Sequence, residues 1–177
     1  AVSYLIEKNI NTPLTSSVGR LFDAVSFLVG LAPEKIEFEA QAPVSLEAAA
    51  SLARATTGAY HYLFLKDGLP YRLDFSPAIK EITKELIEGQ KPETIAINFH
   101  DTMARAILDV SLQARQEAGL NKIILTGGVF LNRILLEKTE HLLKQNAFQV
   151  LRPVYYSPGD ESLSLGQIAY GLNLTAR

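Results

Sequence analysis

Apolar residues recur every three to four positions along much of the chain, which is the spacing of helices that bury one face. In residues 13–33, Val18, Phe22 and Val25 lie on one such stripe, a serine before them can cap the helix, and Gly30 can end it. The stretches that we expect to be helical on this basis are 1–9, 13–33, 44–58, 76–89, 92–119, 130–146 and 161–172.

Short apolar runs between these stretches predict strands. Residues 60–75 predict a strand, a turn and a second strand, with Asp67 and Gly68 supplying the reversal. Residues 122–126 and 148–152 flank a predicted helix, so they form a strand, helix, strand unit whose two strands run parallel. The pattern therefore indicates an α/β fold.

Composition excludes several classes of function. The chain has 177 residues, 47% of them hydrophobic, with a formal net charge of −2, so we expect neither nucleic acid nor an anionic membrane as a partner. The absence of cysteine excludes disulfides, thiolate metal ligands and a cysteine nucleophile. Apolar runs such as residues 24–29 are far shorter than the roughly 20 residues that span a bilayer.

The stretch LTGGVFLN, residues 125–132, follows the first parallel strand, and SPGD, residues 157–160, follows the second. Ligands of parallel sheets bind beyond the carboxyl ends of the strands, where the next helix presents unpaired N–H groups. We therefore expect these two loops to be neighbours. Gly127 and Gly128 either make a tight turn or clear side chains from a loop so that a ligand can approach the backbone.

Two polar residues in these loops each have two interpretations. Asn132 is a poor helix former in the first turn of a predicted helix, but its amide can both donate and accept, as a purine or ribose edge requires. Asp160 precedes a predicted helix and can cap it, while the neighbouring Gly159 leaves room for a metal ion or a phosphate.

Four motifs in order resemble the HypF family of hydrogenase maturation carbamoyltransferases, and the likeness runs from about Leu14 to Gly171. They are PLTSSVGRLFDAVSFLVGL, NFHDTMARAILDV, LTGGVFLNRILLEK and SPGDESLSLGQIAYG. The resemblance implies an actin-like ATPase (ribonuclease H-like) lobe, a mixed sheet with packed helices, with residues 1–177 forming the C-terminal lobe of the transferase domain. A threonylcarbamoyladenosine transferase-type lobe is the nearest alternative.

The resemblance also implies an activity. HypF proteins are cytoplasmic and use ATP to make carbamoyl-adenylate, from which the carbamoyl group passes to the C-terminal cysteine of a HypE partner. By the same resemblance, Gly127, Gly128 and Asn132 contact the nucleotide, Asp23 contacts the ribose hydroxyls, and Asp160 helps to hold a divalent metal. No residue of this chain is assigned a catalytic role.

Departures from the family pattern limit this transfer. Glu161 and Ser162 make the loop after Asp160 bulkier, Ala40 stands where the family has glycine, and the paired-histidine metal motif of the preceding lobe is absent. We therefore expect a fragment that folds but is inactive, holds no tight metal by itself, and exposes a face for its missing upstream lobe or for a homodimer partner. The competing hypothesis is a non-catalytic nucleotide-binding or partner-docking module.

The three histidines lack the i, i+4 spacing of a helical metal pair, so we expect structural or surface roles for them. His100 is the histidine that merits a test, because the Phe-His pair to which it belongs is part of the motif NFHDTMARAILDV that resembles the family.

Overall fold

The computed structural model describes residues 2–175 and has the α/β organisation that the sequence pattern predicts. Its elements in chain order are α1 (Val2–Glu7), α2 (Val18–Leu28), α3 (Gln41–Leu52), β1 (Leu63–Leu65), β2 (Arg72–Asp74), α4 (Ser76–Ile87), α5 (Pro92–Ala118), β3 (Lys122–Ile124), α6 (Arg133–Gln145), β4 (Gln149–Leu151) and α7 (Leu163–Thr175). Short 3-10 turns, Gly128–Leu131 and Asp160–Ser162, precede α6 and α7.

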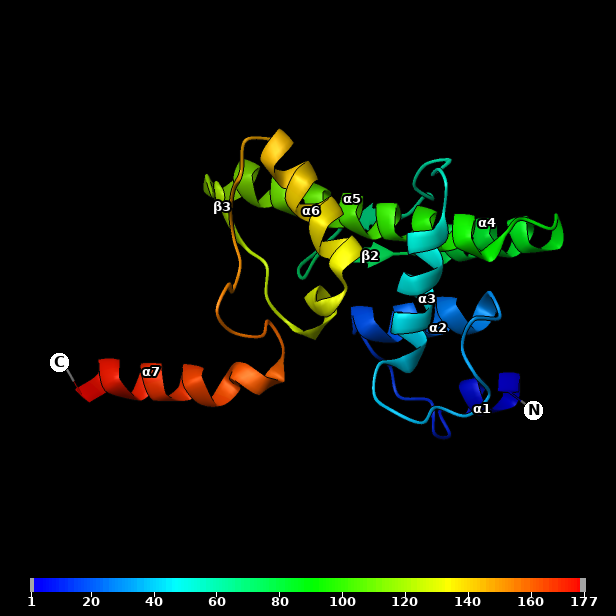
Figure 1. Ribbon diagram of the computed structural model, residues 1–177, viewed down its shortest axis with the longest axis horizontal. Coiled ribbons are helices and arrows are strands. Elements are labelled where there is room, and N and C mark those ends of the chain that lie inside the picture. The colour runs from blue at the N-terminus through cyan, green and yellow to red at the C-terminus, as the bar shows by residue number, and fades with distance from the viewer. Residues whose placement is uncertain (1, 176–177) are drawn as a thin grey trace.

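The long helix α5 lies at the centre of the packing. Helices α3, α4 and α6 contact it along its length, and α2 contacts it through Phe22 (Figure 1). The apolar residues Ile95, Phe99 and Met103 of α5 recur at helical spacing and are buried, whereas Val110, further along the same stripe, is 42% exposed. The Phe22 ring of α2 meets the Phe99 ring edge-on, with centroids 5.0 Å apart. Burying one such side chain contributes about 2 to 3 kcal/mol. The core of this lobe therefore forms within the chain and fixes α2, α3 and α6 relative to one another.

The strands pair as the sequence predicts. β1 and β2 are antiparallel, with Phe64 opposite Leu73. β3 and β4 are parallel, with Ile123 opposite Val150, and α6 makes the crossover between them. In the described part of the chain these pairs form two separate small sheets, so parallel and antiparallel pairing are divided between them.

Two predicted helices have different boundaries in the structure, in the first case because contacts from distant residues override the local pattern and in the second because a tighter turn precedes the helix. The helix expected at 44–58 spans Gln41–Leu52, and the following segment is extended because Asn98 of α5 binds Thr56 and Thr57. β-branched threonines also favour extended backbone. The helix expected from residue 130 begins at Arg133, because residues 128–131 form a 3-10 turn.

The expected serine caps also differ in detail. Ser17 occupies the N-cap position of α2, but its side chain makes no capping hydrogen bond. Ser76, which at the start of the stretch 76–89 is also expected from the sequence to be an N-cap, is the first helical residue of α4, and its N–H donates to Asp74 Oδ1 at 2.8 Å. α2 begins directly after the serine expected to precede it, and α4 begins at Ser76, the first residue of the stretch expected to be helical.

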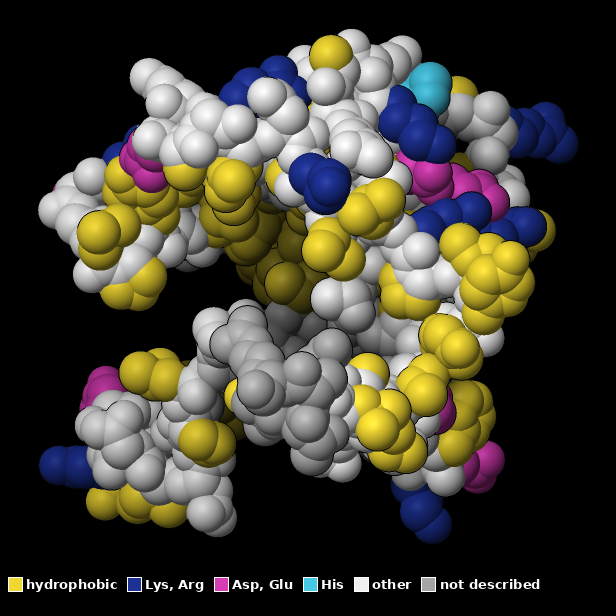
Figure 2. Space-filling view, turned by 90° about the vertical axis from the view of Figure 1, so that its left-hand side faces the viewer, with side chains coloured by type: hydrophobic (Ala, Val, Ile, Leu, Met, Phe, Trp, Pro, Cys, Tyr) yellow, Lys and Arg dark blue, Asp and Glu magenta, His cyan; other side chains and the backbone are white. Residues whose placement is uncertain are grey.

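Apolar side chains remain exposed at the β3 and α7 end of the molecule. α7 extends away from the body, and on this side the surface is hollowed, with apolar side chains around the hollow (Figures 1 and 2). The exposed apolar residues here include Ile124, Val154, Tyr155, Leu163 and Ile168. Within residues 2–175, no helix combines the length and apolar character needed to cross a bilayer.

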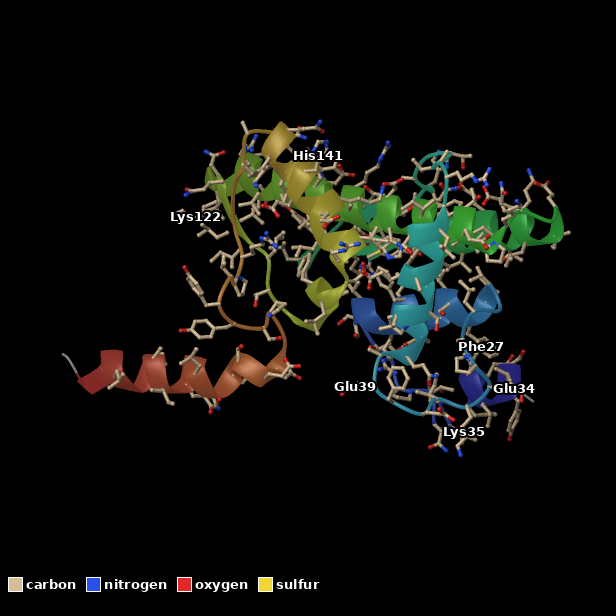
Figure 3. The ribbon with its side chains drawn as sticks, viewed as in Figure 1. Phe27, Glu34, Lys35, Glu39, Lys122 and His141 are labelled. Atoms are coloured by element: carbon tan, nitrogen blue, oxygen red, sulfur yellow. The ribbon has the colours of Figure 1, made fainter. Side chains whose placement is uncertain are left out.

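The outward-facing side chains include one that the sequence placed on the surface, His141, and one that it placed on the buried stripe of α2, Val18, which is 36% exposed. His141 lies on the outer side of α6, as predicted (Figure 3). Phe27, at the end of α2, is 69% exposed. Phe27 is thus an apolar residue of α2 that the described residues leave uncovered, while Phe22 and Val25 on the other side of the helix belong to the core.

Candidate functional site

A cleft of about 660 Å³ opens between α2, the start of α3, the turn before α6 and the loop before α7. All five residues to which the sequence gave a binding role line it: Asp23, Gly127, Gly128, Asn132 and Asp160. They come from elements more than a hundred residues apart in the chain. The structure therefore brings the predicted site residues together in one place.

The two loops beyond the parallel strands are joined directly. The Gly127 N–H donates to the Pro158 carbonyl at 2.7 Å, and the Thr126 hydroxyl donates to the same oxygen at 3.4 Å. This confirms that the loops after β3 and β4 are neighbours, as parallel pairing requires.

The two glycines, Gly127 and Gly128, differ in their structural roles. Gly127 has φ 100° and ψ 155°, a backbone conformation that is open essentially to glycine. Gly128 has no such constraint, and a Cβ placed on it would meet no atom within 4 Å. Gly127 is therefore required by the conformation of the turn, whereas the conformation of the turn does not require glycine at position 128. The second glycine keeps this part of the cleft free of a side chain.

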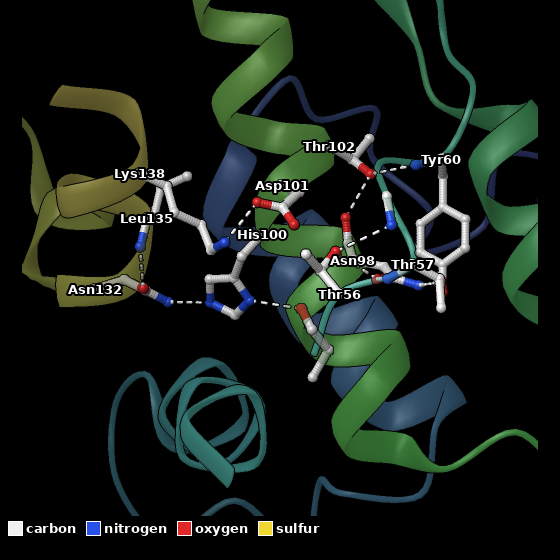
Figure 4. A network of polar contacts seen from close by, with 12 residues as sticks. Thr56, Thr57, Tyr60, Asn98, His100, Asp101, Thr102, Asn132, Leu135 and Lys138 are labelled. Carbon is white, nitrogen blue, oxygen red and sulfur yellow. Dashed lines mark hydrogen bonds and ion pairs between the residues drawn. The ribbon is translucent and has the colours of Figure 1, made fainter. Parts of the chain in front are cut away.

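Asn132 is the N-cap of α6, not a residue of its first turn as predicted. Its Oδ1 accepts a hydrogen bond from the Leu135 N–H at 2.9 Å. Its Nδ2 donates to His100 Nε2, also at 2.9 Å (Figure 4). The side chain retains one N–H and one oxygen lone pair for a ligand.

His100, which supports Asn132, is completely buried on α5. Its Nδ1 lies 2.7 Å from the Ala96 carbonyl oxygen, one turn back in the same helix. Burial lowers the pKa of His100, and Lys138 lowers it further, while the Ala96 carbonyl, Asp101 and Asn132 raise it. The net direction is downward, so the ring is neutral at pH 7.

The N-terminus of α6 differs from the expectation of unpaired N–H groups. Glu47 of α3 reaches across the cleft, and its Oε1 accepts from the Arg133 N–H at 2.8 Å and the Ile134 N–H at 3.4 Å. Together with Asn132, it fills the anion-binding end of this helix. Sequence reasoning missed Glu47, because it lies 86 residues before Arg133 and no local signal marks it.

Asp23 carries an oxygen that the protein leaves without a donor. Arg20 Nη1 lies 3.0 Å from Asp23 Oδ2 but without hydrogen-bond geometry, so this buried oxygen has no hydrogen-bond donor within residues 2–175. The Asp23 side chain is 27% exposed and lines the cleft. A hydroxyl group of a ligand is a suitable donor for such a carboxylate.

Ala40, where the resembled family has glycine, lies in the left-handed region with φ 62° and ψ 14°. It is the N-cap of α3 and lines the cleft. The backbone at this position has the conformation that glycine adopts readily and that alanine adopts with strain. Alanine at this position therefore carries local backbone strain that glycine would not.

The charges that line the cleft are mostly acidic. Among the described residues these charged side chains are Asp23, Glu39, Glu47, Asp160 and Glu161, with Arg20 as the single cation. Asp160 is exposed, and Glu161 accepts from the Ser157 hydroxyl at 2.8 Å. No group of three or more His, Asp or Glu side chains in residues 2–175 is placed to hold a metal ion. Asp160 can supply one ligand, so these residues do not make a complete divalent-metal site.

Fold, cleft and motifs together define a lobe of a Kae1-like transferase domain. The family model described as "Carbamoyltransferase, Kae1-like Domain, second subdomain" matches residues 1–167. The chain therefore belongs to the HypF carbamoyltransferase family. This confirms the resemblance drawn from the motifs.

Individual relatives agree with this assignment. The chain is 37% identical over 157 residues to the carbamoyltransferase HypF of Synechocystis sp., covering 88% of this chain and 19% of that protein. It is 33% identical to a HypF homolog of Cupriavidus necator, covering 94% of this chain and 43% of the homolog. A crystal structure of full-length HypF in the phosphate- and nucleotide-bound form superposes with a TM-score of 0.85 at 34% identity, over 93% of this chain and 25% of that one. The chain thus spans between about a fifth and somewhat less than half of the length of these relatives.

Proposed function

We propose that this chain is the nucleotide-binding second lobe of a hydrogenase maturation carbamoyltransferase. In this role it helps to hold carbamoyl-adenylate, made with ATP, while the carbamoyl group passes to the C-terminal cysteine of a HypE-type partner. The observation that carries the proposal is the convergence of Asp23, Gly128 and Asn132 on one cleft. The nucleotide-bound state of the full-length HypF structure supports it.

The charge of the cleft indicates which part of the nucleotide it takes. An acidic surface with Arg20 as its single cation repels a phosphate, and Glu47 already fills the N-terminus of α6 within the described structure. A nucleoside carries no charge and presents hydroxyl groups that can donate hydrogen bonds to the Asp23 carboxylate, which lines the cleft. We therefore assign the ribose and base to this lobe and the phosphate to cations supplied by the rest of the polypeptide.

The reaction itself requires groups beyond this chain. Transfer from an adenylate to a thiol requires the two reactants to be held together, and such positioning contributes several kcal/mol. The described residues of this cleft supply binding groups and at most one metal ligand, Asp160. The lobe binds and orients, and the chemistry takes place where it meets the upstream part of the polypeptide.

A calorimetric comparison of two aspartates tests the proposal in the whole polypeptide that carries this chain. Asp23→Asn removes a cleft carboxylate, while the matched control Asp67→Asn removes a carboxylate that pairs with Arg72 on the β1–β2 turn, away from the cleft. We expect Asp23→Asn to weaken AMP and adenosine binding about tenfold, the effect of one charge-assisted hydrogen bond worth about 1.5 kcal/mol. Asp67→Asn should change neither affinity.

The competing partner-docking role gives a different result. If the whole polypeptide binds neither adenosine nor AMP, or if both aspartate variants bind them like the wild type, this cleft is not a nucleoside site. A binding signal for a protein partner that Asp23→Asn removes would then favour docking.

A further inference from the structure

The amide oxygen and the NH₂ group of Asn132 are nearly equal in size, so packing alone does not determine which of the two faces the helix and which faces the histidine. The oxygen accepts hydrogen bonds and the NH₂ group donates them, so turning the amide over exchanges the positions of the donor and the acceptor that a ligand in the cleft meets. Something must therefore fix the orientation of this amide before it can recognise a ligand.

Two contacts fix that orientation: the Leu135 N–H, which can only donate, takes the amide oxygen, and the contacts of His100 require the same orientation at the nitrogen end. The Ala96 carbonyl can only accept, so His100 Nδ1, at 2.7 Å, carries the ring proton and donates it. A neutral ring then leaves Nε2 without a proton, as an acceptor. The Asn132 group 2.9 Å away must therefore be its NH₂ group, and the amide oxygen is directed to the Leu135 N–H (Figure 4).

The surroundings keep His100 in this state. The ring is fully buried and packs against the Phe22 ring, with centroids 5.2 Å apart. Beside it, Lys138 of α6 and Asp101 of α5 form an ion pair at 2.6 Å, which holds the helix that bears Asn132 against the helix that bears His100. The histidine thus connects the packed core directly to the cleft.

We propose that His100 is a positioning residue for nucleoside recognition, which holds the Asn132 amide in the orientation that the ligand requires. It does so from the core, without touching the ligand. This inference rests on the proposed function, because it assumes that Asn132 contacts the nucleoside.

A double-mutant cycle on adenosine affinity in the whole polypeptide tests it. His100→Leu removes the acceptor, and Asn132→Ser removes the carboxamide while keeping a good N-cap for α6. We expect each change to weaken binding about five- to tenfold, and the double variant to bind no more weakly than Asn132→Ser, because His100 acts through Asn132. His100→Gln, whose side-chain oxygen can accept from Asn132, should recover most of the affinity.

A matched control separates positioning from general support of the core. Thr102 lies two residues after His100 on α5, is equally buried, and accepts from the Tyr60 N–H at 2.8 Å, on the side away from Asn132 (Figure 4). Thr102→Val should lower stability and leave adenosine affinity unchanged.

The outcomes distinguish the two proposals. If Asn132→Ser leaves affinity unchanged, Asn132 is not a contact, and the assignment of Asn132 to the nucleoside site is wrong. If Asn132→Ser weakens binding but His100→Leu does not, or if His100→Leu weakens it equally in the Asn132→Ser background, the positioning role is overturned. Should His100→Leu fail to fold, ¹⁵N NMR of the wild-type ring decides: a proton on Nε2 overturns the inference, and a proton on Nδ1 with recovery by His100→Gln supports it.

Discussion

The two glycines of the 125–132 stretch should respond to alanine in opposite ways. Gly127→Ala puts a side chain on a backbone with φ 100° and ψ 155°, whereas Gly128→Ala puts one into open space. The same chemical change, one residue apart, therefore tests separately the turn and the clearing of the cleft.

The magnitudes follow from these conformations. A non-glycine residue in the region of Gly127 costs about 1 to 3 kcal/mol, and the lower entropy of the unfolded alanine chain offsets about 0.4 to 1 kcal/mol of it. We expect Gly127→Ala to destabilise the chain by about 1 to 2 kcal/mol, which lowers Tm by roughly 3 to 6 °C for a domain of this size. Gly128→Ala avoids the strain, so it should be neutral or stabilising by up to about 1 kcal/mol.

Thermal unfolding of the 177-residue chain measures the stability difference, and calorimetry with adenosine in the whole polypeptide measures binding. Gly128→Val, with a larger side chain in the cleft, should bind adenosine at least tenfold more weakly while the circular dichroism spectrum stays that of the wild type. Equal destabilisation by the two alanines would refute the division of roles, as would wild-type affinity in Gly128→Val.

Other predictions concern acidity, strain, assembly and metal. Burial lowers the pKa of His100 in the folded state, so near and below pH 6.5 the unfolded chain binds a proton on this ring more readily than the folded chain does. The free energy of unfolding should therefore fall as the pH falls below about 6.5. Urea titrations should show a weaker dependence of this free energy on pH for His100→Gln. Ala40→Gly relieves the left-handed strain at φ 62° and, after the entropy cost of glycine, should raise the free energy of unfolding by about 0.5 to 1 kcal/mol in the same titrations. The isolated chain should fold, self-associate at micromolar concentration through its exposed apolar residues, and fail to carbamoylate a HypE C-terminal peptide; a strictly monomeric species in light scattering, or measurable transfer, would contradict this. Elemental analysis after chelator dialysis should find less than one equivalent of divalent metal, since Asp160 offers one ligand and such ions need several.

Periodic burial made the long elements predictable. The stripe of Ile95, Phe99 and Met103 marks α5 because a helix that packs on one side needs apolar residues at that spacing, and the same physics identifies α2 and α6. The end of α3 was not predictable, because it depends on Asn98 binding Thr56 and Thr57, which are some forty residues away in the chain.

The site was predictable to the extent that topology or family motifs reach it. Parallel pairing places the Gly127 and Asp160 loops at one sheet edge, so their proximity follows from the sequence pattern. The place of Asp23 in the same cleft followed from the family resemblance, since the spacing of residues in α2 does not indicate it. The bond between His100 and Asn132 and the cap by Glu47 join residues distant in the chain, and no local pattern encodes either.

The cap formed by Glu47 affects how substitutions at this cleft should be interpreted. Its carboxylate holds the first two N–H groups of α6, so Glu47→Ala would loosen the start of that helix and displace Asn132 with it. In a screen that scores ligand binding across all positions, Glu47 would therefore resemble a ligand contact, although its carboxylate accepts hydrogen bonds from the backbone of α6. A parallel screen for abundance would separate the two cases, because loss of the cap lowers the amount of folded protein and loss of a true contact does not.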